Sequence, residues 1–175
     1  MKVYPHFEDL PSPAEPCVVT IGSFDGLHRG HQLLLERVKE KASKKNWLSA
    51  AMTFRPHPAT LLAPTYSPPL LMNTEHKLHA LSALDLDFTL VQRFDDPFAA
   101  LPAREFARMV LAERMSARAV VVGEDFTFGK DRQGRVDGLM AYGREFGFEV
   151  EVLKRLSVKG IEISSTRIRS FLLDR

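Results

Sequence analysis

Short runs of apolar, often β-branched residues alternate along the chain with longer segments of helical periodicity. The apolar runs predict strands at residues 17–21, 47–54, 87–94, 118–123 and 148–153. The helical patterns predict helices at residues 30–45, 73–84, 102–115 and 137–146, and a final helix capped by Ser164 or Ser165. This alternation predicts an α/β fold, with a mostly parallel sheet of about five or six strands and helices on both faces.

One segment, residues 59–72, interrupts the alternation. It is rich in proline and shows neither strand nor helix periodicity, so we expect a loop there. Loops of this length inside a compact domain are usually functional or mobile. We therefore interpret residues 59–72 as a lid over a ligand site.

The turn between the first predicted strand and the first predicted helix contains three glycines and two histidines. Helix N-termini have unpaired N–H groups and a positive dipole end, so such a turn can bind a phosphate. His28 and His31 could donate hydrogen bonds to phosphate oxygens. The turn lacks the Gly-Lys-Ser/Thr of a Walker A loop and the Gly-x-Gly-x-x-Gly of a dinucleotide fingerprint. The simpler alternative is an ordinary turn with surface histidines.

A second possible phosphate site lies at the start of the final helix. Hydroxyls and backbone amides of Ser164, Ser165 and Thr166 could hold phosphate oxygens there. Arg167 and Arg169 follow within a turn and supply planar, permanently charged groups. A plain helix cap would explain the hydroxyls equally well.

Two further segments follow predicted strands, and the carboxyl ends of parallel strands meet at one edge of a sheet. Asp125, Phe126 and Phe128 follow the strand at 118–123, and His57 lies between two prolines after the strand at 47–54. Asp125 could face a ribose or a metal-bound phosphate, and the phenylalanines could flank a planar ring. Core packing is the alternative for the aromatic residues, and simple surface exposure is the alternative for His57.

Composition narrows the class of protein. The chain has 175 residues, 45% hydrophobic and 26% charged, which suits one globular domain over residues 1–175. A net charge of +2 gives no reason to expect nucleic acid. The single cysteine, Cys17, lies in a predicted strand and is expected to be inert. We find no signal-peptide pattern and no membrane-spanning stretch, and expect a cytoplasmic protein with no membrane or obligatory protein partner.

Together these motifs resemble the bacterial FAD synthetase family, specifically its FMN adenylyltransferase module. The His-x-Gly-His and Ser-Ser-Thr-x-x-Arg motifs are shared with a wider nucleotidyltransferase superfamily. The Pro-His-Pro and Gly-x-Asp-Phe-x-Phe-Gly motifs narrow the resemblance to the members of this superfamily that act on flavin. Ser23 stands where the family commonly has asparagine. The similar segments are residues 18–31, 53–58, 121–129 and 163–169.

The resemblance implies a Rossmann-like nucleotidyltransferase fold and transfer of AMP from MgATP to the phosphate of FMN. Mg²⁺ would be the cofactor, held with the help of Asp125, and ATP and FMN the substrates. It implies catalytic roles for His28, His31 and Arg169, and a flavin site at Phe54, His57 and Phe128. The implied ATP-binding residues are Gly22, Ser23, Phe24, Asp25, Gly30, Asp125, Ser164, Ser165 and Thr166.

Two alternatives to this function stay open at the level of sequence. The acceptor could be another phosphorylated compound, such as a pantetheine phosphate or nicotinamide mononucleotide. The chain could also bind flavin nucleotides without catalysis, in a regulatory role. The family usually has a riboflavin kinase barrel after its last helix, so a chain that stops at Arg175 is expected to lack the kinase domain and its activity.

Overall fold

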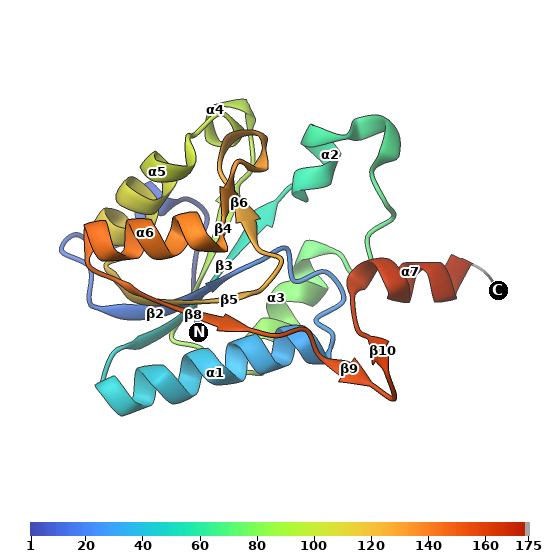
Figure 1. The fold of residues 1–175 in the computed structure, drawn as a ribbon, viewed down its shortest axis with the longest axis horizontal. Coiled ribbons are helices and arrows are strands. Elements are labelled where there is room, and N and C mark those ends of the chain that lie inside the picture. Colours follow the sequence, from blue (N-terminus) through green and yellow to red (C-terminus); the bar gives the residue numbers. More distant parts are fainter. Residues whose placement is uncertain (174–175) are drawn as a thin grey trace.

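A parallel sheet of six strands runs through the molecule (Figure 1). The structure, a computed structural model, describes residues 1–173. The strand order is β1-β4-β3-β2-β5-β8, and every neighbouring pair is parallel. The strands are β1 (Lys2–Tyr4), β2 (Cys17–Ile21), β3 (Leu48–Arg55), β4 (Phe88–Arg93), β5 (Ala117–Gly123) and β8 (Glu149–Leu153).

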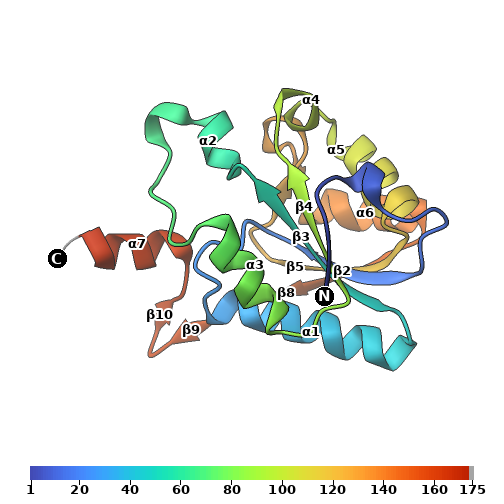
Figure 2. The ribbon, with the colours of Figure 1, turned by 180° about the vertical axis from the view of Figure 1, so that it is seen from behind.

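Helices cover both faces of this sheet and enclose two hydrophobic cores (Figures 1 and 2). Successive side chains of a strand point to opposite faces, so in β2 Val19 packs into one core and Val18 into the other. The first core lies under two helices. One is α6, and the other is the helix whose residues Phe106–Arg114 are π-helical. The second core lies under α1 and α3. The bounds are α1 (Arg29–Lys45), α3 (Thr74–Ser82), α5 (Ala103–Glu105), which leads into the π-helical stretch, and α6 (Val136–Phe146).

The predicted class of fold is confirmed, and the five predicted strands lie within about two residues of the observed ones. The prediction of a continuous loop at 59–72 is wrong at its start, because Pro58–Leu62 forms α2. A proline at the first helical position needs no N–H partner, so it can begin a helix there.

Several short elements were not predicted from the sequence. They are β1, the helix α4 (Asp96–Ala99), the hairpins β6 (Thr127–Phe128) with β7 (Gly134–Arg135) and β9 (Ser157–Val158) with β10 (Ile161–Glu162), and 3-10 turns at Phe7–Asp9, Pro64–Tyr66 and Lys130–Arg132. The final helix, α7, spans Ser165–Leu173.

The order of strands determines where a ligand can bind. From the central β2 the chain continues to β3 and β4 on one side, and later returns to β5 and β8 on the other. The boundary between β2 and β5 is therefore a topological switch point, and in open α/β sheets a crevice forms there at the carboxyl ends of the strands. In residues 1–173, none of the helices combines the length and the apolar character that crossing a membrane would demand.

Candidate active site

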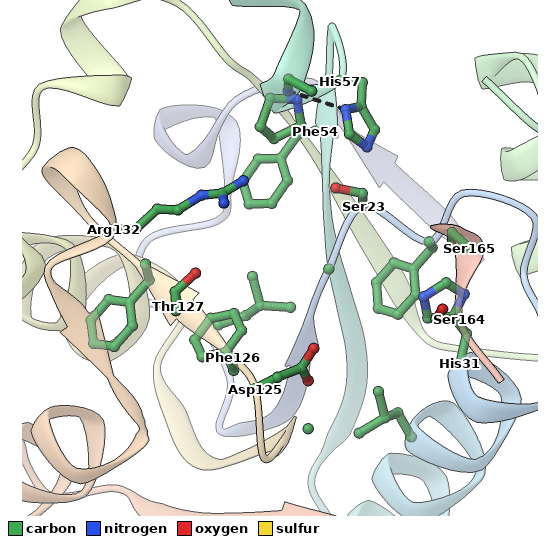
Figure 3. Close-up of a pocket in the computed structure, with 18 of the residues that line it drawn as sticks. Ser23, His31, Phe54, His57, Asp125, Phe126, Thr127, Arg132, Ser164 and Ser165 are labelled. Atoms are coloured by element: carbon green, nitrogen blue, oxygen red, sulfur yellow. Dashed lines mark hydrogen bonds between the residues drawn. The ribbon is translucent and has the colours of Figure 1, made fainter. Parts of the chain in front are cut away.

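A cavity of about 490 Å³ lies at the carboxyl ends of the strands. Its lining comes from the segments after β2, β3, β4 and β5 and from the start of α7 (Figure 3). This volume is in the range of small-molecule sites. The predicted site residues that line it are Gly22, Ser23, Phe24, His28, Gly30, His31, Phe54, His57, Asp125, Phe128, Ser164, Ser165 and Thr166.

His28 is held as the N-cap of α1. Its Nδ1 accepts a hydrogen bond from the backbone N–H of His31, at 3.3 Å between the nitrogens. A neutral imidazole whose Nδ1 accepts must have its proton on Nε2. Burial lowers the pKa of His28, which favours this neutral form. His28 therefore lines the cavity as a neutral ring with one N–H left to donate.

His31 packs directly against His28. The two rings stack with their centroids 3.6 Å apart, and Phe24 meets the His31 ring edge-on at 5.3 Å. Burial, followed by the proximity of His28, lowers the pKa of His31 to about 3. Within residues 1–173 its buried Nδ1 has no hydrogen-bond partner. Buried polar atoms without a partner are rare in folded proteins, and they are found at functional sites.

Gly30 allows this packing of the two histidines. A Cβ atom at Gly30 would lie 3.2 Å from both Cε1 and Nδ1 of His28, closer than such atoms usually pack. Gly26, the middle glycine of the turn, has a φ of +82°, and a Cβ atom there would clash with Leu71, so both the backbone conformation and the lack of space exclude a side chain.

His57 repeats the geometry of His28 at the opening of another helix. It is the N-cap of α2, and its Nδ1 accepts a hydrogen bond from the backbone N–H of Ala59 at 3.1 Å, drawn as the dashed line in Figure 3. Burial lowers the pKa of His57. The neutral ring therefore also has its proton on Nε2.

Aromatic side chains form another part of the cavity wall. Phe54 and Phe128, predicted from the sequence, are joined there by Phe94, Phe98 and Phe106, which sequence reasoning missed. Phe98 lies at the centre of this group, with ring centroids 6.2 Å from Phe54, 5.8 Å from Phe94 and 6.1 Å from Phe106. Phe126 stacks on Phe128 at 5.5 Å. Such a wall suits a flat, largely apolar ring system.

Asp125 lines the cavity with an exposed carboxylate. It forms an ion pair with Arg155, at 3.0 Å between Oδ2 and Nη2, and Arg155 also pairs with Glu162 at 2.9 Å. Surface pairs of this kind stabilise a protein little, so a ligand can compete for Asp125. Among residues 1–173, no group of three or more His, Cys, Asp or Glu side chains is arranged to hold a metal ion by itself.

Asp25 and Arg169 do not line the cavity. Both side chains are buried and they pair with each other, at 2.5 Å between Oδ2 and Nη2. The Asp25 carboxylate also accepts hydrogen bonds from the backbone N–H groups of Leu71 and Met72, and Arg169 Nε donates to the carbonyl oxygen of Pro69. Burial raises the pKa of Asp25, but these amides and the Arg169 guanidinium outweigh it and hold the pKa below its ordinary value.

This ion pair fastens together three segments next to residues that line the cavity. They are the turn after β2, the end of the proline-rich segment at residues 69–72, and α7, whose Ser165 hydroxyl donates to the Asp25 carbonyl oxygen at 2.8 Å. One end of the segment interpreted as a lid is therefore fixed. The predicted contacts of Asp25 and Arg169 with phosphate would require this pair to open, and they stay predictions.

The parallel sheet, the switch-point cavity and the glycine-histidine turn at a helix N-terminus define a nucleotidyltransferase-like α/β protein. Comparison with known proteins supports this class. The profile of the FAD synthetase family matches residues 10–167, and the chain belongs to that family.

Curated relatives are similar over nearly the whole chain. The bifunctional riboflavin kinase/FMN adenylyltransferase of Escherichia coli (strain K12) is 39% identical over 163 residues, which cover 93% of this chain and 52% of the relative. The protein of the same name from Buchnera aphidicola subsp. Schizaphis graminum is 32% identical over 175 residues, 99% of this chain and 56% of the relative. The chain thus spans about half the length of the curated relatives it matches.

Two solved structures are similar in fold. A crystal structure from Streptococcus pneumoniae, described as a macrolide-efflux protein, aligns with a TM-score of 0.85 and 31% identity, over 99% of this chain and 56% of that one. A pantoate-beta-alanine ligase from Francisella tularensis aligns with a TM-score of 0.62 and 14% identity, over 96% and 72% of the two chains. The second likeness concerns the fold alone.

Proposed function

We propose that this chain transfers AMP from MgATP to the phosphate of FMN and so forms FAD and pyrophosphate. The observation that supports this most is that one cavity combines a phosphate-type end with an aromatic wall. The phosphate-type end contains His28, His31 and the start of α7, and the aromatic wall is built around Phe98. Family membership and the printed name of the curated relatives point to the same reaction.

In this reaction an oxygen of the FMN phosphate attacks the α-phosphorus of ATP. A new O–P bond forms, the bond from the α-phosphorus to the bridging oxygen breaks, and pyrophosphate leaves with the electron pair. The nucleophile is already an anion, so no residue needs to remove a proton. The protein contributes alignment of two bound phosphates and stabilisation of the charge that moves to the leaving group.

The residues in contact with the phosphates would be neutral hydrogen-bond donors. The Nε2–H of His28 and the free backbone N–H groups at the starts of α1 and α7 are suited to oxygens that gain negative charge. His31, with its unpaired ring nitrogen, would complete this set on the wall beside His28. Ser164 and Thr166 would add hydroxyls at the α7 end.

The donor set around Asp125 fits Mg²⁺ that arrives with ATP. Mg²⁺ usually keeps several waters and binds one or two carboxylates together with substrate phosphates. Asp125 offers one exposed carboxylate on the cavity wall and would have to exchange Arg155 for the ion. When bound, Mg²⁺ would neutralise charge on the triphosphate.

The flavin would lie against the aromatic wall. Phe54 and Phe128 provide flat faces, and the Nε2–H of His57 provides a donor at the edge of that wall. Arg169 and Asp25 would act through the segments that they fasten together, because in the paired state neither side chain lines the cavity.

The experiment is a chromatographic separation of flavins after incubation with ATP and Mg²⁺. One reaction contains FMN, a second contains riboflavin, and two more contain pantetheine phosphate or nicotinamide mononucleotide. We expect FAD from FMN alone. Transfer of AMP to one of the other phosphorylated acceptors, with no FAD from FMN, would reject the proposal.

A further inference from the structure

Lys77 of α3 is a buried lysine with no place in the reaction described so far. Only 7% of its surface is exposed. Its Nζ donates to the carbonyl oxygen of Ser23 at 3.0 Å, to Oγ1 of Thr53 at 3.1 Å and to the carbonyl oxygen of Phe54 at 3.4 Å. An ammonium group has three donors, so all of them are used. Lysine is seldom buried so deeply unless its charge has a specific role or partner.

The three acceptors lie at the carboxyl ends of the neighbouring strands β2 and β3. Ser23 belongs to the turn after β2, which leads to His28, and the ring of Phe54 belongs to the aromatic wall at the end of β3. Thr53 strengthens the connection, because its Oγ1 also donates to the Ser23 carbonyl oxygen at 3.1 Å. Lys77 therefore ties the backbone of the turn after β2, here called the phosphate turn, to the backbone of the aromatic wall at the end of β3, here called the flavin wall.

The charge of Lys77 is also unusual for its surroundings. Desolvation lowers the pKa of Lys77, and nearby Asp25 acts against this. Asp25 is already paired with Arg169, and within residues 1–173 Lys77 forms no ion pair. The hydrogen bonds of the ammonium group therefore go to carbonyl and hydroxyl oxygens. A positive charge of this kind beneath the turn helps to keep His31 neutral, since it lowers the pKa of that ring.

We propose that Lys77 is a positioning residue for adenylyl transfer, which holds the phosphate turn and the flavin wall at the separation that aligns the two reacting phosphates. This inference rests on the proposed function. Displacement of a reacting group by about 1 Å can reduce turnover about 100-fold, so a residue that never touches substrate can govern the rate.

The test compares Lys77→Met with Lys41→Met. Methionine keeps most of the length of lysine and removes its ammonium group in both variants. Lys41 in α1 pairs with Glu149 and Glu151 and lies outside the cavity lining, so it is a matched control. For Lys77→Met we expect kcat to fall about 10- to 100-fold with much smaller changes in KM for ATP and FMN, measured well below the melting temperature. Lys41→Met should keep the wild-type kcat.

An unchanged kcat in folded Lys77→Met would overturn the proposal, and so would a loss of kcat that only matches the unfolded fraction. If Lys77→Met does not fold, Thr53→Val decides the question. It keeps the shape of the side chain but removes the hydroxyl between Lys77 and Ser23. A folded Thr53→Val protein should lose kcat about 3- to 10-fold. Full activity would contradict the proposal that Lys77 and Thr53 hold the phosphate turn and the flavin wall together.

Hydrogen exchange separates a failure of this proposal from a failure of the proposed function. Peptides that contain Ser23 and Phe54 should exchange faster in Lys77→Met than in wild type, but not in Lys41→Met. If the wild-type chain makes no FAD, the proposed function fails. Hydrogen exchange alone then tests whether Lys77 connects the phosphate turn to the flavin wall. Unchanged exchange in both peptides would overturn the proposed connection.

Discussion

Replacement of Arg169 by methionine tests whether the buried pair with Asp25 stabilises the segments around the site. The two side chains are 10% and 4% exposed, so removal of Arg169 leaves a carboxylate buried without its counter-charge. Breaking a buried pair in this way costs about 3–5 kcal/mol. The amides of Leu71 and Met72 still donate to Asp25, so we expect the lower end of that range.

The assay is urea unfolding of wild type, Arg169→Met, Asp25→Asn and the double variant. A loss of about 3 kcal/mol in a domain of this size also lowers the melting temperature by about 6–12 °C. The double variant should lose less stability than the sum of the single variants, by about 1–3 kcal/mol, because each single change removes the same pair. Arg155→Met is the matched control, since it breaks the exposed pair with Asp125 and should cost at most about 1 kcal/mol.

The pH dependence follows from the lowered pKa of Asp25. The stability that this carboxylate contributes is present above the pKa of an ordinary aspartate and is lost as the pH falls through its folded value. The difference between wild type and Arg169→Met should therefore be largest at neutral pH and shrink in acid. Additive single effects, or an Arg169→Met protein as stable as wild type but inactive, would refute the structural role and favour direct contact with phosphate.

Three further predictions concern the cavity. His28→Ala and His31→Ala should lower kcat about 100-fold or more while KM for FMN changes little, as for other donors to developing negative charge; unchanged turnover in both variants would remove them from the mechanism. In NMR titrations the ring of His31 should stay neutral down to about pH 3 and the ring of His28 should titrate below the ordinary histidine pKa, because burial lowers both pKa values; titration of either at about pH 6.5 would contradict this. Phe98→Ala should raise KM for FMN up to about 10-fold and leave KM for ATP unchanged, since the ring lies at the centre of the aromatic wall; a shift in KM for ATP instead would place the adenine there.

The main strands could be predicted because each is a short apolar run flanked by glycine, proline or polar residues. Strand β1 was missed since an edge strand of three residues has too little pattern, and α2 was missed since its prolines suggested a loop. Proline at the first turn of a helix is favourable, and here it directly follows His57, the N-cap of the helix.

The motif residues around the cavity could be predicted because they follow strands that end at one edge of the sheet. The pairing of Asp25 with Arg169 could not, since these residues are 144 positions apart and both have side chains typical of ligand contacts. Phe94, Phe98 and Phe106 gave no signal, because aromatic residues near a strand normally suggest core packing. Lys77 gave none either, because a lysine within a helix is usually exposed.

The central claim is an attack by the FMN phosphate on the α-phosphorus of ATP, and position-specific labelling of ATP tests it most directly. The chain is incubated with FMN, Mg²⁺ and ATP that carries radioactive phosphorus at the α or at the γ position. The account predicts that FAD acquires the α label and that the γ label appears in pyrophosphate. Label from the γ position in a flavin product would show transfer of the terminal phosphate and contradict the account.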